Sequence, residues 1–269
     1  MNGVCSGKTQ YFIMADIPIR CESRRRPPVW LPLARSLLRV LDKVPTNCPL
    51  CRGASRGGAP CPGCLDDMSP PLLLPRCGLC ALALARGLRC PDCAALRPAF
   101  DRVVAAFDYQ PPVDQLILQL KNAARFQHAR YMAAALAEAV DRAVPPVQGI
   151  TILLPVPSSR QALRRRGFNP AGEIARQVAA RLGLPYRPGA LRRVGEGVSQ
   201  KRLGRAARTG PDAARYACTQ RLDGEVVAVI DDVLTTGATM HAIALALKQA
   251  GAAQVVGLVV ARTPYRQEP

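Results

Sequence analysis

Residues 226–240 of the chain are VVAVIDDVLTTGATM, and this stretch decides the fold. Five apolar residues, 226–230, predict a strand that is buried on both faces, as in a parallel sheet. The strand is expected to end at Asp231 and Asp232, and a short loop of Thr, Gly and Ala leads to a helix from Met240. We therefore predict an α/β fold with both acids and the loop at the carboxyl edge of the sheet, where such sheets bind ligands.

The loop that follows the acids has the composition of a phosphate site. Gly237 permits a close backbone approach or a positive φ, and the N–H groups that open a helix attract anions. Asp231 and Asp232 would repel a phosphate, so we expect them to face sugar hydroxyls or Mg²⁺. A ribose 5-phosphate meets both requirements, whereas the alternative is an ordinary turn with the acids as a polar cap. The expected phosphate-binding residues are Thr235, Thr236, Gly237, Ala238 and Thr239.

Eight of the eleven cysteines form four C-x-x-C pairs with a repeated spacing. Two pairs separated by nine residues occur twice within 48–93, which indicates an internal duplication. Two such turns supply the four thiolates of a tetrahedral structural zinc site. We predict two zinc ions bound sequentially along the repeat, with an interleaved pairing as the alternative. Disulfides or a redox pair fit the pattern less well. The expected ligands are Cys48, Cys51, Cys61, Cys64, Cys77, Cys80, Cys90 and Cys93.

A second group of candidate phosphate ligands follows a short buried strand at 151–154. The strand is expected to end in a Ser-Ser-Arg turn, beside three consecutive arginines at 164–166. Arginine side chains match phosphate oxygens with two parallel hydrogen bonds, which favours a pyrophosphate site here. The alternative is a solvated charge run before the next helix. The expected ligands are Ser158, Arg160 and Arg166.

The chain is strongly basic, and one long basic segment stands out. Its 269 residues carry a net charge of +18, which attracts nucleotides, pyrophosphate or nucleic acid. A solvated surface without a dedicated partner is the alternative. Residues 192–218 are polar and basic without clean periodicity, and they include Lys201. We predict a lid over a polyanion there, with a disordered insertion as the alternative.

Composition divides the chain into four parts. Residues 1–28 show no periodicity and are expected to form a disordered leader, or to precede the true start. Residues 29–46 predict an amphipathic helix that packs on the protein, with contact to a membrane surface as the alternative. The double zinc ribbon is assigned to 47–96 and the α/β domain to 99–265. No segment approaches the roughly 18 apolar residues of a membrane span, so we expect a cytoplasmic protein without a transmembrane segment.

Taken together, these motifs resemble the ComF family. The strand, the acids and TTGAT at 235–239 are similar to the phosphoribosyl-pyrophosphate (PRPP) loop of type I phosphoribosyltransferases. The paired ribbons, RGFN at 166–169 and QKRL at 200–203 extend the likeness over about 47–263. The resemblance implies a phosphoribosyltransferase-like domain that binds PRPP with Mg²⁺ behind a double zinc ribbon. It also implies a role in natural transformation, through handling of single-stranded DNA in the cytosol with the DNA-uptake machinery.

Two functions are compatible with this resemblance. The first is an active phosphoribosyltransferase with an unknown acceptor, in which Asp231 and Asp232 hold the ribose or the metal. Arg160, Arg166 and Lys201 would then neutralise the departing pyrophosphate. The second is a nucleic-acid handling module that binds PRPP without turnover. Departures from the family pattern at Lys121-Asn122 and near Pro211 concern the lid and hood rather than the PRPP loop.

Overall fold

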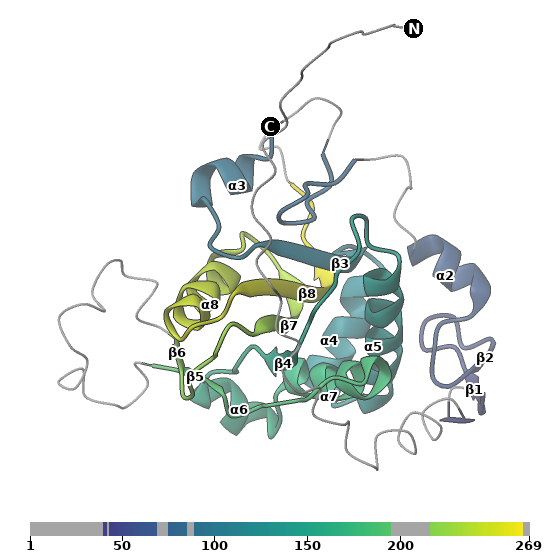
Figure 1. Cartoon of the computed structure of the whole chain (residues 1–269). Helices are drawn as coiled ribbons and strands as arrows, with labels where there is room; N and C mark the ends of the chain where they lie inside the picture. Colours follow the sequence, from purple (N-terminus) through teal and green to yellow (C-terminus); the bar gives the residue numbers. More distant parts are fainter. Residues whose placement is uncertain (1–39, 42, 69–74, 85–88, 195–215, 266–269) are drawn as a thin grey trace, which may run out of the picture.

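The computed structural model describes residues 40–41, 43–68, 75–84, 89–194 and 216–265 (Figure 1). The predicted leader at 1–28 and the predicted lid with Lys201 therefore lie outside the described residues. Most of the helix predicted over 29–46 also lies outside the described residues. The last two residues of that range belong to strand β1 (Pro45–Asn47) instead.

Four parallel strands form the central sheet, in the order β3-β8-β7-β4. This arrangement confirms the predicted fold class. The two middle strands are almost continuously apolar because helices cover both faces of the sheet. The strands are β3 (Arg102–Asp108), β4 (Ile152–Pro155), β7 (Val226–Leu234) and β8 (Gln254–Arg262).

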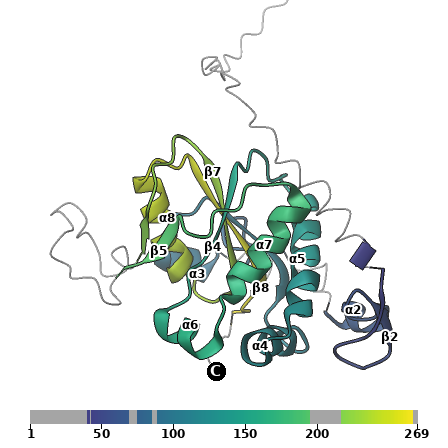
Figure 2. The ribbon, with the colours of Figure 1, turned by 90° about the horizontal axis from the view of Figure 1, so that it is seen from below.

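Helices pack on the two faces of this sheet in separate groups (Figure 2). One face is covered by α4 (Val113–Ala123), α5 (Phe126–Asp141) and α7 (Pro170–Leu182). The other is covered by α8 (Ala238–Gln249), which buries Ile243 and Leu247 against the strands. Each helix lies in a connection between parallel strands, as crossover connections require.

Two boundaries at the carboxyl edge differ from the sequence expectation. β7 continues through the acid pair to Leu234, because Asp231 and Leu234 are still in register with Val259 and Arg262 of β8. α8 begins at Ala238, two residues before the predicted start at Met240.

A short helix occupies the segment that was expected to be a Ser-Ser-Arg turn beside three arginines. α6 (Arg160–Arg166) follows β4 after a short loop. The Ser159 hydroxyl accepts a hydrogen bond from the Ala162 N–H (3.1 Å) and caps the helix, which explains why the basic run becomes helical. Beyond α7, β5 (Leu191–Arg193) and β6 (Tyr216–Cys218) form a small antiparallel pair.

The cysteine-rich segment contributes two small units at different places. The first consists of the hairpin β1 (Pro45–Asn47) and β2 (Ala54–Arg56) with helix α2 (Pro62–Met68). The second contains the bridge between Arg76 and Ala83 and helix α3 (Pro91–Leu96). Among the described helices, none has the length and apolar character needed to cross a bilayer.

Candidate functional site

The two cysteine units share one backbone design. The Cys48 N–H donates to the Gly53 carbonyl (2.7 Å), and the Cys77 N–H donates to the Leu82 carbonyl (2.8 Å). The residue that follows the first C-x-x-C turn of each unit has a positive φ, 65° at Arg52 and 58° at Ala81. The duplication predicted from spacing is therefore a duplication of local structure.

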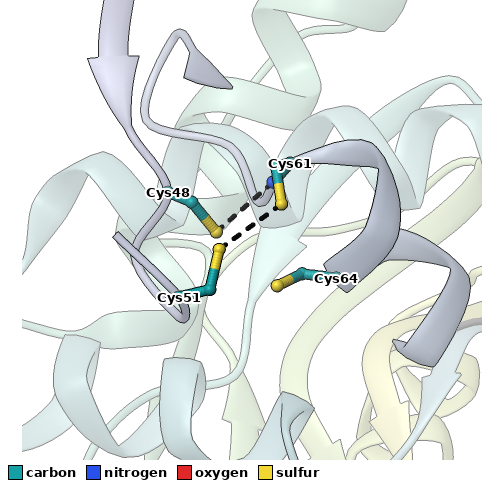
Figure 3. A group of neighbouring side chains, drawn as sticks. All are labelled: Cys48, Cys51, Cys61 and Cys64. Carbon is teal, nitrogen blue, oxygen red and sulfur yellow. Dashed lines mark hydrogen bonds between the residues drawn. The ribbon is translucent and has the colours of Figure 1, made fainter. Parts of the chain in front are cut away.

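Each unit gathers four sulfur atoms, and the pairing is sequential along the chain. Within each group all four Sγ atoms lie within 4.8 Å of one another, close to the about 3.8 Å edge of a tetrahedral zinc–thiolate site. Figure 3 shows the first group, with its four side chains pointing toward a common centre. The cysteines gather in two sequential groups rather than interleaved ones, and their role as zinc ligands stays a prediction. The clusters are Cys48, Cys51, Cys61 and Cys64, and Cys77, Cys80, Cys90 and Cys93.

The thiols of the first cluster differ in acidity. Burial acts to raise the pKa of Cys48, but backbone hydrogen bonds, led by that of Cys51, lower it to about 6. Burial and hydrogen bonds to the other three thiols raise the pKa of Cys64 to about 12. The four thiols therefore do not all ionise at neutral pH by themselves, whereas a divalent metal deprotonates its thiol ligands. The donor set suits structural zinc.

The acid pair lies on β7 at the carboxyl edge, and its two members differ. The Lys121 ammonium of α4 forms an ion pair with Asp232 (Nζ to Oδ1, 2.8 Å). The Asp232 N–H donates to Asp231 Oδ1 (2.9 Å). Burial, with the charge of Asp232 as a second cause, raises the pKa of Asp231 to about 8. Asp231 is thus largely protonated at neutral pH until a metal or a donor favours its charged form.

The loop after the acids exposes its hydroxyl side chains and buries its glycine. Thr235, Thr236 and Thr239 are exposed, and Ala238 opens α8. Gly237 has a φ of 86°, and an added Cβ would lie 3.4 Å from the Leu96 side chain. The loop therefore requires glycine for its conformation and offers the N–H groups of a helix start to an anion.

The β4 loop lies beside the acid pair because β4 and β7 are neighbouring parallel strands. The Val156 N–H donates to the Ile230 carbonyl (2.9 Å), one residue before Asp231. The Ser158 hydroxyl donates to Asn169 Oδ1 (2.9 Å), and Asn169 Nδ2 donates to the Val156 carbonyl (2.9 Å). Ser158 is thus positioned on the same sheet edge as the acids.

The two arginines expected at the pyrophosphate are at opposite ends of α6. Arg160 is its first residue and is exposed, whereas Arg166 is its last and is partly buried. Arg166 Nε is buried without a hydrogen-bond partner among the described residues. These positions do not test pyrophosphate binding, and the role of the two arginines stays a prediction.

Sequence reasoning missed two charged residues that the structure brings to this edge. Lys121 pairs with Asp232, although it had drawn attention only as a departure from the family pattern. Arg262 ends the apolar strand β8 and is buried, with 1% of its surface exposed. A lone arginine at the end of an apolar strand is the signal that could have identified it.

Sequence comparisons identify the family to which this α/β chain with two cysteine clusters belongs. Residues 162–269 match the model of the phosphoribosyl transferase domain. The DNA utilization protein YhgH of Salmonella typhimurium is 30% identical over 226 residues, covering 82% of this chain and 98% of that protein. Competence protein F of Haemophilus influenzae is 28% identical over 218 residues, covering 78% and 93%. The chain belongs to the ComF family, with a phosphoribosyltransferase domain and two clusters of four cysteines.

Among solved structures, TT1426 from Thermus thermophilus is similar over 52% of this chain and 86% of its own. The two share 22% sequence identity, with a TM-score of 0.32.

Proposed function

We propose that this protein binds PRPP with Mg²⁺ and acts in natural transformation, by handling single-stranded DNA in the cytosol during DNA uptake. The observation that carries the ligand assignment is the juxtaposition of an acid pair with a glycine-containing helix start on one sheet edge. The names of the relatives, DNA utilization protein and competence protein F, support the biological role.

The ligand assignment follows from charge. The N–H groups at 235–239 would bind the 5-phosphate, and Asp231 and Asp232 would hold the ribose hydroxyls or Mg²⁺. Lys121 keeps one negative charge of the acid pair compensated before a ligand arrives. Because the pKa of Asp231 is raised to about 8, metal binding there would release a proton. Mg²⁺ would supply charge neutralisation for the pyrophosphate, to which Arg160, Arg166 and Lys201 would add theirs.

A basic surface with one exposed aromatic ring supports the DNA assignment. Phe126 at the start of α5 is 46% exposed and packs edge to face against Phe168, with 4.8 Å between ring centroids. Arg125 precedes Phe126, and Arg164 and Arg165 lie just before Phe168; all three arginines are exposed. Aromatic rings beside arginines bind single strands by stacking and by phosphate contacts.

Calorimetric titration tests the ligand site. Wild-type protein with Mg²⁺ should bind PRPP, and the double variant Asp231→Asn, Asp232→Asn should lose that binding. Asp223→Asn is the control, because Asp223 is exposed and pairs with the neighbouring Arg221, away from the acid pair in the chain. Unchanged affinity in the double variant would exclude the acid pair as the ribose or metal site.

Binding of fluorescent single-stranded DNA tests the second assignment. Phe126→Ala should weaken binding about tenfold, the effect of losing one stacked base. Tyr265→Ala removes another exposed aromatic ring, 52% exposed beyond the end of β8, and should leave affinity unchanged. A salt-independent affinity, or equal effects of both substitutions, would contradict the proposed surface.

The alternative function is catalysis at the same site, with transfer of the ribose 5-phosphate from PRPP to an acceptor. The intact acid pair and loop support this alternative. An active enzyme would release pyrophosphate from PRPP only when a nitrogenous acceptor is added. Pyrophosphate release measured across a panel of nucleobases and amines would establish the enzyme. Binding without release would establish a PRPP-binding module.

A further inference from the structure

Arg262, the last residue of β8, is a buried cation between the second cysteine cluster and the ligand loop. Its Nε donates to the Cys80 carbonyl (3.1 Å), and its Nη2 forms an ion pair with Asp92, which lies between two cluster cysteines. Its Nη1 donates to the carbonyls of Leu234 (3.1 Å) and Thr235. One guanidinium therefore contacts both the cluster and the beginning of the loop.

Burial makes these contacts obligatory rather than optional. Arg262 is 1% exposed, and a buried guanidinium is tolerated only when its N–H groups have partners and its charge is compensated. The compensating carboxylate is Asp92, which reaches Arg262 only if the turn from Cys90 to Cys93 keeps its shape. That shape depends on the cysteines being held at one centre.

Two further contacts connect the same unit to the loop and the start of α8. The Ala99 N–H, just after α3, donates to Nδ1 of His241 in α8 (3.0 Å). An added Cβ on Gly237 would lie 3.4 Å from Leu96 and 3.6 Å from Phe100, so these side chains cover the back of the loop. The loop thus packs against the second cysteine unit.

We infer that Arg262 is a positioning residue that couples metal binding at Cys77, Cys80, Cys90 and Cys93 to the shape of the 235–239 loop. Metal at the second cluster fixes the Cys80 carbonyl and Asp92, these fix Arg262, and Arg262 fixes the Leu234 and Thr235 carbonyls. Loss of that metal loosens the loop and weakens phosphate binding. The effect on PRPP rests on the proposed function, whereas the effect on loop order does not.

Hydrogen–deuterium exchange of the peptide covering 233–241 tests this coupling in the full chain. Arg262→Met and the milder Asp92→Asn should each accelerate exchange there, with the largest change at the first turn of α8. Lys248→Met is the control, because Lys248 lies in the last turn of α8 and pairs with Asp101 (3.0 Å) in a solvent-accessible ion pair, away from Arg262 and the loop. It should leave exchange at 233–241 unchanged.

Calorimetry with Mg²⁺–PRPP provides the second readout. Arg262→Met and Asp92→Asn should weaken binding by about tenfold to a hundredfold, the usual effect of removing a residue that orients a site from behind. Exchange at 233–241 that equals wild type in both variants would overturn the inference, and Asp92→Asn alone decides it if Arg262→Met does not fold. If wild type binds no PRPP but loop exchange responds, the coupling stands and the proposed function fails.

Discussion

The two cysteine clusters have the same local structure and different surroundings. In each, the first turn closes with the same backbone hydrogen bonds, and the residue after its second cysteine has a positive φ. The equivalent cysteines Cys51 and Cys80 nevertheless differ, since Cys51 is exposed and Cys80 is 2% exposed. The cysteine spacing therefore determines the local structure of the turn, and the surrounding residues determine how deeply the turn is buried.

The neighbours of the second cluster belong to the core of the α/β domain. Cys80, Leu82 and Phe100 are part of the apolar cluster that α8 buries against the sheet. The first cluster's unit packs on the other face of the sheet through Met68, whose sulfur lies 4.0 Å from the Tyr131 hydroxyl of α5, and through the partly buried Leu50, Ala59 and Leu65. One cluster is integrated into the domain core and the other is attached to its side.

One sequence difference between the repeats lies at the contact with Arg262. The turn from Cys90 to Cys93 contains Asp92, whereas the equivalent position of the first cluster is Gly63. The Asp92 carboxylate forms the ion pair with Arg262, and a glycine has no side chain that could do so. The comparison predicts that the duplicated unit provides a common scaffold and that this substitution adapts one copy to the ligand site.

The largest expected effect is a difference in how much each cluster contributes to the free energy of unfolding. The double variant Cys90→Ser, Cys93→Ser should lower the free energy of unfolding by about 3 kcal/mol or more, because it releases buried core residues along with the metal. Cys61→Ser, Cys64→Ser should leave the main unfolding transition within about 1 kcal/mol of wild type. Urea unfolding followed by circular dichroism measures both.

Metal analysis provides the control for that pair, because each variant should retain about one zinc per chain. Equal destabilisation by the two double variants would show that the clusters are equivalent supports of the fold.

A smaller effect is expected from single apolar residues beside each cluster. Leu82 is fully buried, so Leu82→Ala should destabilise by about 2–4 kcal/mol. Leu50 is only partly buried at the margin of the core on the other face of the sheet, so Leu50→Ala should cost about 1 kcal/mol. Thermal unfolding ranks the two, and a reversed order would mean that the first cluster is the more strongly packed.

A third expected effect is a pH dependence at the ligand edge. The pKa of Asp231 is about 8 in the fold against 3.8 as the ordinary value, so its contribution to stability is complete below about pH 4 and is lost as pH rises toward 8. Asp231→Asn removes this loss and should stabilise the ligand-free protein by about 2 kcal/mol at pH 9, or roughly 4–8 °C.

The free energy of unfolding is measured for wild type and for Asp231→Asn at pH 5 and at pH 9. The difference between the two proteins at each pH cancels the contributions of the other titrating groups. The pH dependence should persist when the first cluster carries Cys61→Ser and Cys64→Ser, since Met68 beside that cluster packs on Tyr131 of α5, whereas the acids are on β7. A pH-independent difference between wild type and Asp231→Asn would show that the acid is not held in its protonated form.

Features set by neighbouring residues could be predicted from the sequence. The C-x-x-C spacing was sufficient for both clusters because each turn closes on itself, and the apolar run at 226–230 was sufficient for the parallel sheet. The predicted end of the strand at the acid pair was wrong, because β7 continues past the acids through its pairing with β8. That pairing depends on tertiary contacts.

Long-range charge pairs could not be predicted for the same reason. Arg262 and Cys80 are 182 residues apart in the chain, and Lys121 and Asp232 are 111 apart. Neither pair follows a helical or strand spacing, so only the topology brings its members together. The local loop motif predicts the kind of ligand, and the fold shows which residues contact the loop.

The most direct test of the central claim is the affinity for Mg²⁺–PRPP of the two cluster variants, measured by calorimetry side by side with wild type. The account predicts that Cys90→Ser, Cys93→Ser weakens binding by about tenfold or more, while Cys61→Ser, Cys64→Ser binds as wild type does. Equal affinities in the two variants, at matched zinc content, would contradict the claim that the second cluster supports the ligand loop.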